Sequence, residues 1–342
     1  MIEKRKESMM RGMNIGPAAA ALLVCLLSGC AKVDNTSTND AEKIYIDAWM
    51  EVNHPNVTAT GNGIYILDDQ PGSGKAWNGE PFILVDVTTR SLDGTVSSTT
   101  DLGLSRQIGS YQASYYYGPT FKIAAEKSLP EGVEEMLAGM KAGGTRTALI
   151  PSWLMTTSRY KSASKYFKKT TNASTTLYTL TLADFTSDIT AWEGDTLDRY
   201  AHLHMGVDST GFGRYYKQLK APVNTNGFPS DTTVYINYTG RLLNGQVFDT
   251  TIKDTAKFYN IYSSSKSYEP VSITWGETSD DLKMDSNDLK AGFQWILWNM
   301  HKYEKGVGAF ISQYGYSYTG SGKIIPPYAP LVFEIEMVDD PS

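Results

Sequence analysis

The fold is decided by residues 234–251, which read VYINYTGRLLNGQVFDTT. Ile236 and Tyr238 alternate with their neighbours at the period of two that is typical of a half-buried strand. Asn244-Gly245 is a two-residue hairpin signal, and Val247-Phe248 begins a second strand. The stretch therefore predicts a strand, a tight turn and an antiparallel return strand.

The chain beyond this hairpin predicts a sheet packed on one helix. From Leu331 to Val338, apolar residues on one face alternate with two acids, which indicates a strand with one buried face. Leu289 to Met300 is apolar nearly all round, so we expect a helix buried against the sheet. An antiparallel sheet wrapped on a short central helix is an α+β arrangement.

This pattern occurs twice along the chain. Two segments have the spacing of one apolar helical face: Tyr45, Ala48, Trp49 and Val52, and then Leu197, Tyr200, Ala201 and His204. Later landmarks, such as Asp93-Gly94 and Asn244-Gly245, follow in the same order at an offset of about 150 residues. We therefore expect two homologous units, each preceded by an amphipathic helix: residues 43–187, a linker helix over 188–209, and residues 210–342.

Composition and charge exclude several functions. The chain has 342 residues, a net charge of −6 and no Lys/Arg cluster beyond its first dozen residues, so we expect no nucleic-acid partner. His202 and His204 are two residues apart on a predicted helix, which points their rings in different directions. We expect no metal site and no cofactor.

The N-terminus predicts export and lipid anchoring. A basic leader precedes the apolar run from Ala18 to Leu27, which is too short for a stable membrane span. The run ends in Leu27-Ser28-Gly29-Cys30, which resembles the bacterial lipobox. We therefore expect a signal peptide over 1–29, lipidation of Cys30, a tether over 30–42 and attachment to a bacterial membrane, the outer membrane in particular.

Four motifs in the second unit resemble those of FKBP-type peptidyl-prolyl cis-trans isomerases. The resemblance covers about residues 205–340. In chain order, the motifs are VYINYTG at 234–240, GQVFDTT at 245–251, Gly292-Phe293, and IIPPYAPLVFEIE at 324–336.

The resemblance implies a pocket for a proline ring. Phe293 would form its floor, and Tyr238, Phe248, Leu289 and Phe333 its walls. Asp249 and Tyr316 would face the substrate backbone, and Ile324 and Ile325 would lie in an overhanging loop. Two positions depart from the family pattern: Val271 replaces an aromatic residue, and Lys290 replaces an aliphatic one. We expect the Lys290 side chain to turn to solvent.

The first unit keeps the skeleton of the second without these pocket residues. Val87 corresponds to Tyr238, Ser97-Ser98 to Phe248-Asp249, and Val133 to Phe293. We expect an inactive FKBP-like domain. Its use as a spacer, a client-binding surface or a homodimer contact stays open at this point.

The function expected from the resemblance is isomerisation of X-Pro bonds in exported or envelope polypeptides. The alternative is a lipoprotein that binds polypeptides without catalysis. The departures from the family pattern at Val271 and Lys290 favour this alternative. A third idea is a glycan receptor, prompted by Tyr115-Tyr116-Tyr117, although strand aromatics more often serve packing.

Overall fold

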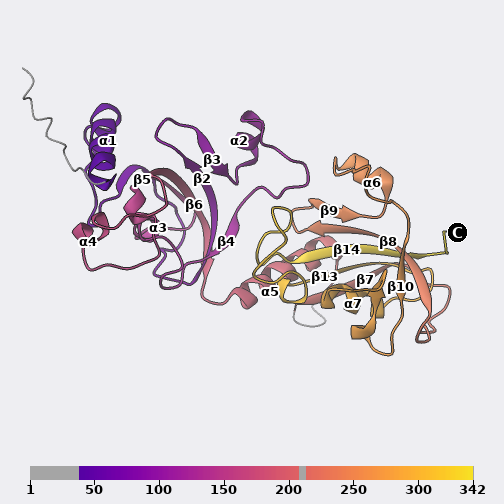
Figure 1. Ribbon diagram of the computed structural model, residues 1–342. Coiled ribbons are helices and arrows are strands. Elements are labelled where there is room, and N and C mark those ends of the chain that lie inside the picture. Colours follow the sequence, from indigo (N-terminus) through magenta and orange to yellow (C-terminus); the bar gives the residue numbers. More distant parts are fainter. Residues whose placement is uncertain (1–37, 208–212, 342) are drawn as a thin grey trace, which may run out of the picture.

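The computed structural model describes residues 38–207 and 213–341. The leader, Cys30 and the start of the tether lie outside the described residues. Two antiparallel sheets stand side by side, each with few helices, and the helix α5 lies between them (Figure 1). The predicted α+β class with two antiparallel sheets is confirmed.

The first unit contains the smaller sheet. Its strand order is β1-β5-β6-β2-β3, and β4 pairs with β2. The strands are β1 (Tyr65–Gln70), β2 (Phe82–Arg90), β3 (Val96–Thr99), β4 (Thr120–Ile123), β5 (Gly144–Ile150) and β6 (Thr176–Thr186). The helices are α1 (Thr38–Asn53), α2 (Leu102–Gln107), α3 (Glu131–Leu137) and α4 (Ala163–Phe167).

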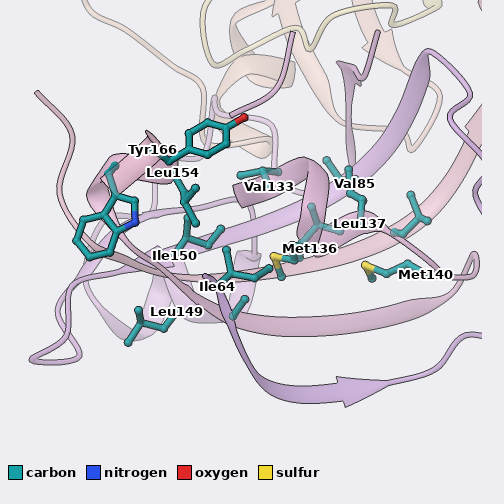
Figure 2. Packing of buried hydrophobic residues seen from close by; sticks show 14 of the residues in the cluster. Ile64, Val85, Val133, Met136, Leu137, Met140, Leu149, Ile150, Leu154 and Tyr166 are labelled. Carbon is teal, nitrogen blue, oxygen red and sulfur yellow. The ribbon is translucent and has the colours of Figure 1, made fainter. Parts of the chain in front are cut away.

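The core of the first unit lies between α3 and this sheet. Val133, Met136 and Leu137 of α3 are buried against Leu149 and Ile150 of β5 and their neighbours (Figure 2). Buried apolar side chains on both sides of this contact supply the main stabilisation of the unit.

The second unit contains the larger sheet. Its strand order is β12-β11-β10-β8-β14-β13-β7, and β9 pairs with β8. The strands are β7 (Arg214–Lys220), β8 (Thr233–Leu242), β9 (Val247–Thr250), β10 (Val271–Thr274), β11 (Lys283–Met284), β12 (Asn287–Asp288), β13 (Lys305–Phe310) and β14 (Leu331–Val338). The helices are α5 (Ile189–Tyr200), α6 (Lys253–Phe258) and α7 (Ala291–Trp298).

The predicted hairpin, final strand and buried helix are present in the second unit. They are β8 with β9, β14, and α7, although α7 is shorter than the expected 289–300. Phe293, Ile296 and Leu297 of α7 are buried. The close approach of α7 to β13 needs Gly292, because a Cβ there would lie 2.3 Å from the Phe310 ring.

The two units share the same hairpin geometry. In the first, the hydroxyls of Thr88 and Thr99 are 2.7 Å apart, and in the second those of Thr239 and Thr250 are 2.9 Å apart. In the first unit β3 pairs with β2, and in the second β9 pairs with β8. Both pairs have the same one-residue bulge near the start of the shorter strand. Thr239 and Thr250 each stand 151 residues after their counterparts. The two hairpins therefore have the same backbone arrangement with different side chains. The second unit has Phe248-Asp249 where the first has Ser97-Ser98.

The prediction of which face of the first leading helix is buried is wrong. Tyr45 and Val52 are 58% and 81% exposed, and Ala48 is exposed as well. Ile46 and Met50 are buried instead, at the i, i+4 spacing of one face. The rotation of α1 is fixed by a polar contact, because the Glu42 carboxylate accepts hydrogen bonds from the Ser152 amide at 3.2 Å and the Ser152 hydroxyl at 2.6 Å.

The helix α1 also begins earlier than expected. Residues 38–42, which we expected in the tether, are helical. The buried Asn39 side chain donates hydrogen bonds to the carbonyls of Phe167 and Lys169, at 2.6 and 2.9 Å. These bonds anchor the first turn of α1 to α4 and the turn that follows it.

The helix α5 repeats this arrangement in front of the second unit. It continues as a π-helical segment, Ala201–Met205, and Leu197 and Ala201 are buried as predicted, whereas His204 is exposed. Glu193 is buried, and its carboxylate accepts hydrogen bonds from the Ser312 amide and hydroxyl at 2.6 and 2.7 Å. Burial raises the pKa of Glu193 to about 7, although both hydrogen bonds oppose that rise.

This buried acid predicts a pH-dependent stability. Because its folded pKa is raised, Glu193 contributes stability that is fully present below its unfolded pKa and is lost as pH rises through about 7. Between pH 5 and 8 we expect the wild type to lose roughly 3 kcal/mol of unfolding free energy relative to Glu193→Gln. Urea titrations of both proteins across this range measure the difference. Identical pH profiles would contradict the assignment.

Candidate active site

A pocket of about 200 Å³ opens between α7, β8, β14 and the segment before β14. Most of its lining is aromatic or aliphatic. The lining residues are Tyr238, Asp249, Met284, Asp288, Leu289, Lys290, Phe293, Phe310, Tyr316, Leu331 and Phe333. Seven of the eleven residues predicted for the site line this pocket: Tyr238, Asp249, Leu289, Lys290, Phe293, Tyr316 and Phe333.

Phenylalanine rings form the floor. Phe293 begins the buried face of α7, and its ring meets Phe333 edge-on with centroids 4.8 Å apart. Phe310 of β13 stacks on the other side of Phe333 at 5.8 Å, and Tyr238 meets Phe293 edge-on at 5.7 Å. Edge-to-face pairs of this kind hold aromatic rings in fixed orientations. We call this group of rings (Tyr238, Phe293, Phe310 and Phe333) the aromatic cup.

Phe248 supports the cup from behind. Its ring packs edge-on against Phe333 at 5.6 Å, and it does not belong to the pocket lining itself. A Cβ at Gly240 would lie 2.6 Å from the Phe248 ring and 2.8 Å from the Phe333 ring. The absence of a side chain at position 240 therefore lets these two rings meet.

Asp249 lies at the rim, held by three partners. Its Oδ2 accepts a hydrogen bond from the Tyr238 hydroxyl at 2.6 Å, and its Oδ1 accepts one from the Thr250 amide at 2.9 Å. The Lys266 ammonium forms an ion pair with Oδ1. Burial and the adjacent carboxylate raise the pKa of Tyr238 well above its ordinary value, so its hydroxyl stays protonated and donates to Asp249.

Tyr316 and Lys290 contact each other in the pocket lining. The Lys290 ammonium lies 4.9 Å from the centroid of the Tyr316 ring, the distance of a cation–π contact. Lys290 is exposed as expected, and its side chain lies along the pocket edge. Burial, followed by the charge of Asp249, raises the pKa of Tyr316, so this hydroxyl also remains a hydrogen-bond donor.

The remaining predicted residues lie around the pocket. Val271 is half-buried on β10 opposite Ile236, packs against the core of the second unit and does not line the pocket. Ile325 is buried, Ile324 is half-buried, and both pack against the core of the second unit without lining the pocket. Both lie in the segment before β14, as expected, but neither lines the pocket.

Sequence reasoning missed several residues of the site. Phe310, Met284, Leu331 and Asp288 line the pocket, and Lys266 pairs with Asp249. The strand that ends in Phe310 was predictable only from its pattern of small and apolar residues, which does not indicate which face meets the pocket. Lys266 lies 17 residues beyond Asp249 in a long connection, so no local pattern indicates their pairing.

The first unit has a different surface at the equivalent place. The strand register places Val87 at the position of Tyr238 and Ser98 at that of Asp249. Val133 is buried in the core beneath. Ser97 and Ser98 line a cavity of about 390 Å³ whose other wall includes Lys323 and Pro326 of the second unit.

Within 38–207 and 213–341, no group of three or more His, Cys, Asp or Glu residues is placed to hold a metal ion. Among the helices of these ranges, none combines the length and apolarity needed to span a bilayer.

The comparisons with known proteins agree with the position of the pocket. Residues 226–338 match the family model of FKBP-type peptidyl-prolyl cis-trans isomerases. The chain is 28% identical over 123 residues to FK506-binding protein 1A of Aspergillus fumigatus, covering 36% of this chain and 90% of that protein. It is 32% identical over 133 residues to FK506-binding protein 59 of Drosophila melanogaster, covering 39% of this chain and a quarter of the Drosophila protein (25%).

Solved structures of similar proteins include two bacterial ones and one from wheat. A peptidyl-prolyl cis-trans isomerase from Pseudomonas syringae is 24% identical, with a TM-score of 0.31, over 44% of this chain and 92% of that one. FkpA from Escherichia coli has the same identity, TM-score and coverage of this chain, and 58% of its own chain is covered. The three FKBP domains of wheat FKBP73 are 16% identical, with a TM-score of 0.29, over 81% of this chain and 94% of that one. Residues 226–338 are therefore similar to FKBP-type peptidyl-prolyl cis-trans isomerases.

Proposed function

We propose that the protein is a peptidyl-prolyl cis-trans isomerase acting on proline-containing polypeptides that are exported to the cell envelope. The observation that carries the proposal is the aromatic cup with the Tyr238–Asp249 hydrogen bond at its rim. A proline ring is a compact apolar group, and a cup of about 200 Å³ matches one such ring with its adjoining amide.

Rotation of an X-Pro amide needs no bond cleavage. The barrier of roughly 18–20 kcal/mol comes from the partial double bond between carbon and nitrogen. Water stabilises the charge-separated planar form, so an apolar cup that excludes water removes part of that stabilisation. The hydroxyls of Tyr238 and Tyr316 and the carboxylate of Asp249 would then favour the twisted amide over either planar isomer.

The proposed site of action is the bacterial envelope. The lipobox-like Leu27-Ser28-Gly29-Cys30 supports a lipid anchor at Cys30, with the outer membrane as its place. Slow prolyl isomerisation limits the folding of many chains, so an anchored isomerase would act on polypeptides as they fold after export. Homodimer formation through the first unit is part of the same proposal.

Non-catalytic polypeptide binding is the second candidate. It is favoured by two cations at the rim, since Lys266 pairs with Asp249 and Lys290 lies over Tyr316. The departure from the family pattern at Val271 also favours this candidate. In that case the protein would suppress aggregation of a proline-free client, while exchange of X-Pro peptides stayed at the uncatalysed rate.

Removal of the rim acid provides the first test. In the full chain, Asp249→Ala should reduce kcat/KM for an X-Pro peptide at least tenfold, because the Tyr238 hydroxyl loses the acceptor that orients it and the rim loses its negative charge. Phe333→Ala should reduce it as well, by opening the cup. NMR exchange spectroscopy of the peptide measures both rates.

The matched control is Asp254→Ala, which removes an exposed acid from α6 and should leave the rate unchanged. A correctly folded wild type without any acceleration would defeat the proposed function.

Lys266 should matter far less than the acid it pairs with. The Lys266–Asp249 ion pair is partly exposed, and such pairs contribute about 0.2–1 kcal/mol. Lys266→Ala should therefore lower kcat/KM by about twofold to fivefold at low salt, and 1 M salt should remove the difference from wild type. A loss as large as that in Asp249→Ala would show that the ammonium itself contacts the substrate.

A further inference from the structure

The segment between β13 and β14, residues 311–330, brings Tyr316 to the pocket. Regular secondary structure is limited to one 3₁₀ turn at Ser312–Tyr314. Backbone hydrogen bonds within the segment are therefore joined by contacts from outside it. One anchor lies at its start, where the buried Glu193 of α5 accepts two hydrogen bonds from Ser312. Further anchors lie on the core of the second unit, through the buried Ile325, and on the first unit.

Tyr328 connects the first unit to the pocket. Its ring meets two phenylalanines of the first unit edge-on, Phe82 of β2 at 5.6 Å and Phe121 of β4 at 6.0 Å. Its backbone amide donates a hydrogen bond to the carbonyl of Ser317 at 2.9 Å, and Ser317 follows Tyr316 in the chain. One residue therefore contacts both the first unit and the neighbour of a pocket residue.

The backbone at Tyr328 supports this interpretation. Its φ is +59°, a left-handed conformation that a bulky side chain adopts only when its surroundings impose it. Ser317, its hydrogen-bond partner, also has a positive φ, of +52°. The two strained residues face each other across the segment, and the two phenylalanine rings of the first unit supply the external contact that fixes the Tyr328 side chain.

A second set of contacts joins the first unit to the middle of the segment. The Tyr116 amide donates a hydrogen bond to the Lys323 carbonyl at 2.7 Å, and the Lys323 ammonium lies 5.3 Å from the centre of the Tyr115 ring. The Gln246 side chain, from the β8–β9 turn, donates to the Tyr115 carbonyl at 2.9 Å. Figure 1 shows the segment before β14 at this boundary between the two sheets.

We propose that the first unit, which lacks the aromatic cup, positions the segment that carries Tyr316. Tyr328 is the positioning residue, and its ring packs against Phe82 and Phe121. The proposal rests on the proposed isomerase function and adds a role for the first unit in it. A spacer would require only a covalent connection through α5. Ring contacts, a strained tyrosine and backbone hydrogen bonds to the segment go beyond that requirement.

The test compares Tyr328→Ala with Tyr328→Phe in the full chain. The alanine variant loses the ring contacts, whereas the phenylalanine variant keeps the ring and removes only the hydroxyl. In Tyr328→Ala we expect amide hydrogen exchange at residues 315–328 to rise at least tenfold and kcat/KM for an X-Pro peptide to fall at least fivefold. Tyr328→Phe should match wild type in both measurements. Exchange rates at β8 check that the second unit stays folded.

Two further variants complete the design. Phe82→Ala alters only the first unit and should change both readouts in the same direction as Tyr328→Ala. Tyr318→Ala removes a ring from the same segment that is 64% exposed, and it should change neither.

The proposal is overturned if Tyr328→Ala and Tyr328→Phe show equal exchange and equal kcat/KM. It is also overturned if Phe82→Ala leaves residues 315–328 as protected as in wild type. An inactive wild type would defeat the proposed function instead, and the exchange data would still decide whether the first unit orders the segment.

Discussion

The close packing of α7 on β13 is the constraint on which the rest of the second unit depends. A Cβ at Gly292 would lie 2.3 Å from the Phe310 ring, and one at Gly308 of β13 would lie 2.3 Å from Ile296 of α7. Each element therefore lacks a side chain where the other approaches. This approach brings Phe293 edge-on against Phe333, which in turn stacks on Phe310, so the same contact forms part of the core and the aromatic cup.

The two units show how one skeleton can keep its fold and change its surface. The threonine pairs that join the hairpin strands are present in both, as are the glutamates, half-buried Glu42 and buried Glu193, that attach each leading helix to a serine. The residues that differ are those that face the pocket, where Ser97-Ser98 replace Phe248-Asp249. The serine surface of the first unit instead faces the segment of the second unit that includes Lys323.

The sequence predicted the parts of the fold that depend on periodicity. The β8–β9 hairpin follows from strict alternation and Asn244-Gly245, and α7 from a continuous apolar run. The face of α1 was not predictable in this way, because its rotation depends on the buried polar contact between Glu42 and Ser152. Apolar residues such as Val52 mislead a count of hydrophobic spacing when the helix lies at an edge, where one side remains in water.

The candidate site was predictable mainly through its resemblance to a family. Motifs located Tyr238, Asp249, Phe293 and Phe333, because these residues lie in or next to regular elements. Long-range contacts could not be predicted from the sequence. They include the pairing of Lys266 with Asp249 and the packing of Tyr328 on the first unit. Such contacts join residues from loops of irregular length, and the sequence carries no periodic signal for them.

Binding of the prolyl ring in the aromatic cup can be measured by NMR of the full chain bound to a short peptide with one X-Pro bond. We expect intermolecular nuclear Overhauser effects between the prolyl ring protons and the rings of Phe293 and Phe333, with none for a peptide that carries alanine in place of proline. Equal binding of both peptides, or prolyl contacts confined to a surface outside the aromatic cup, would contradict it.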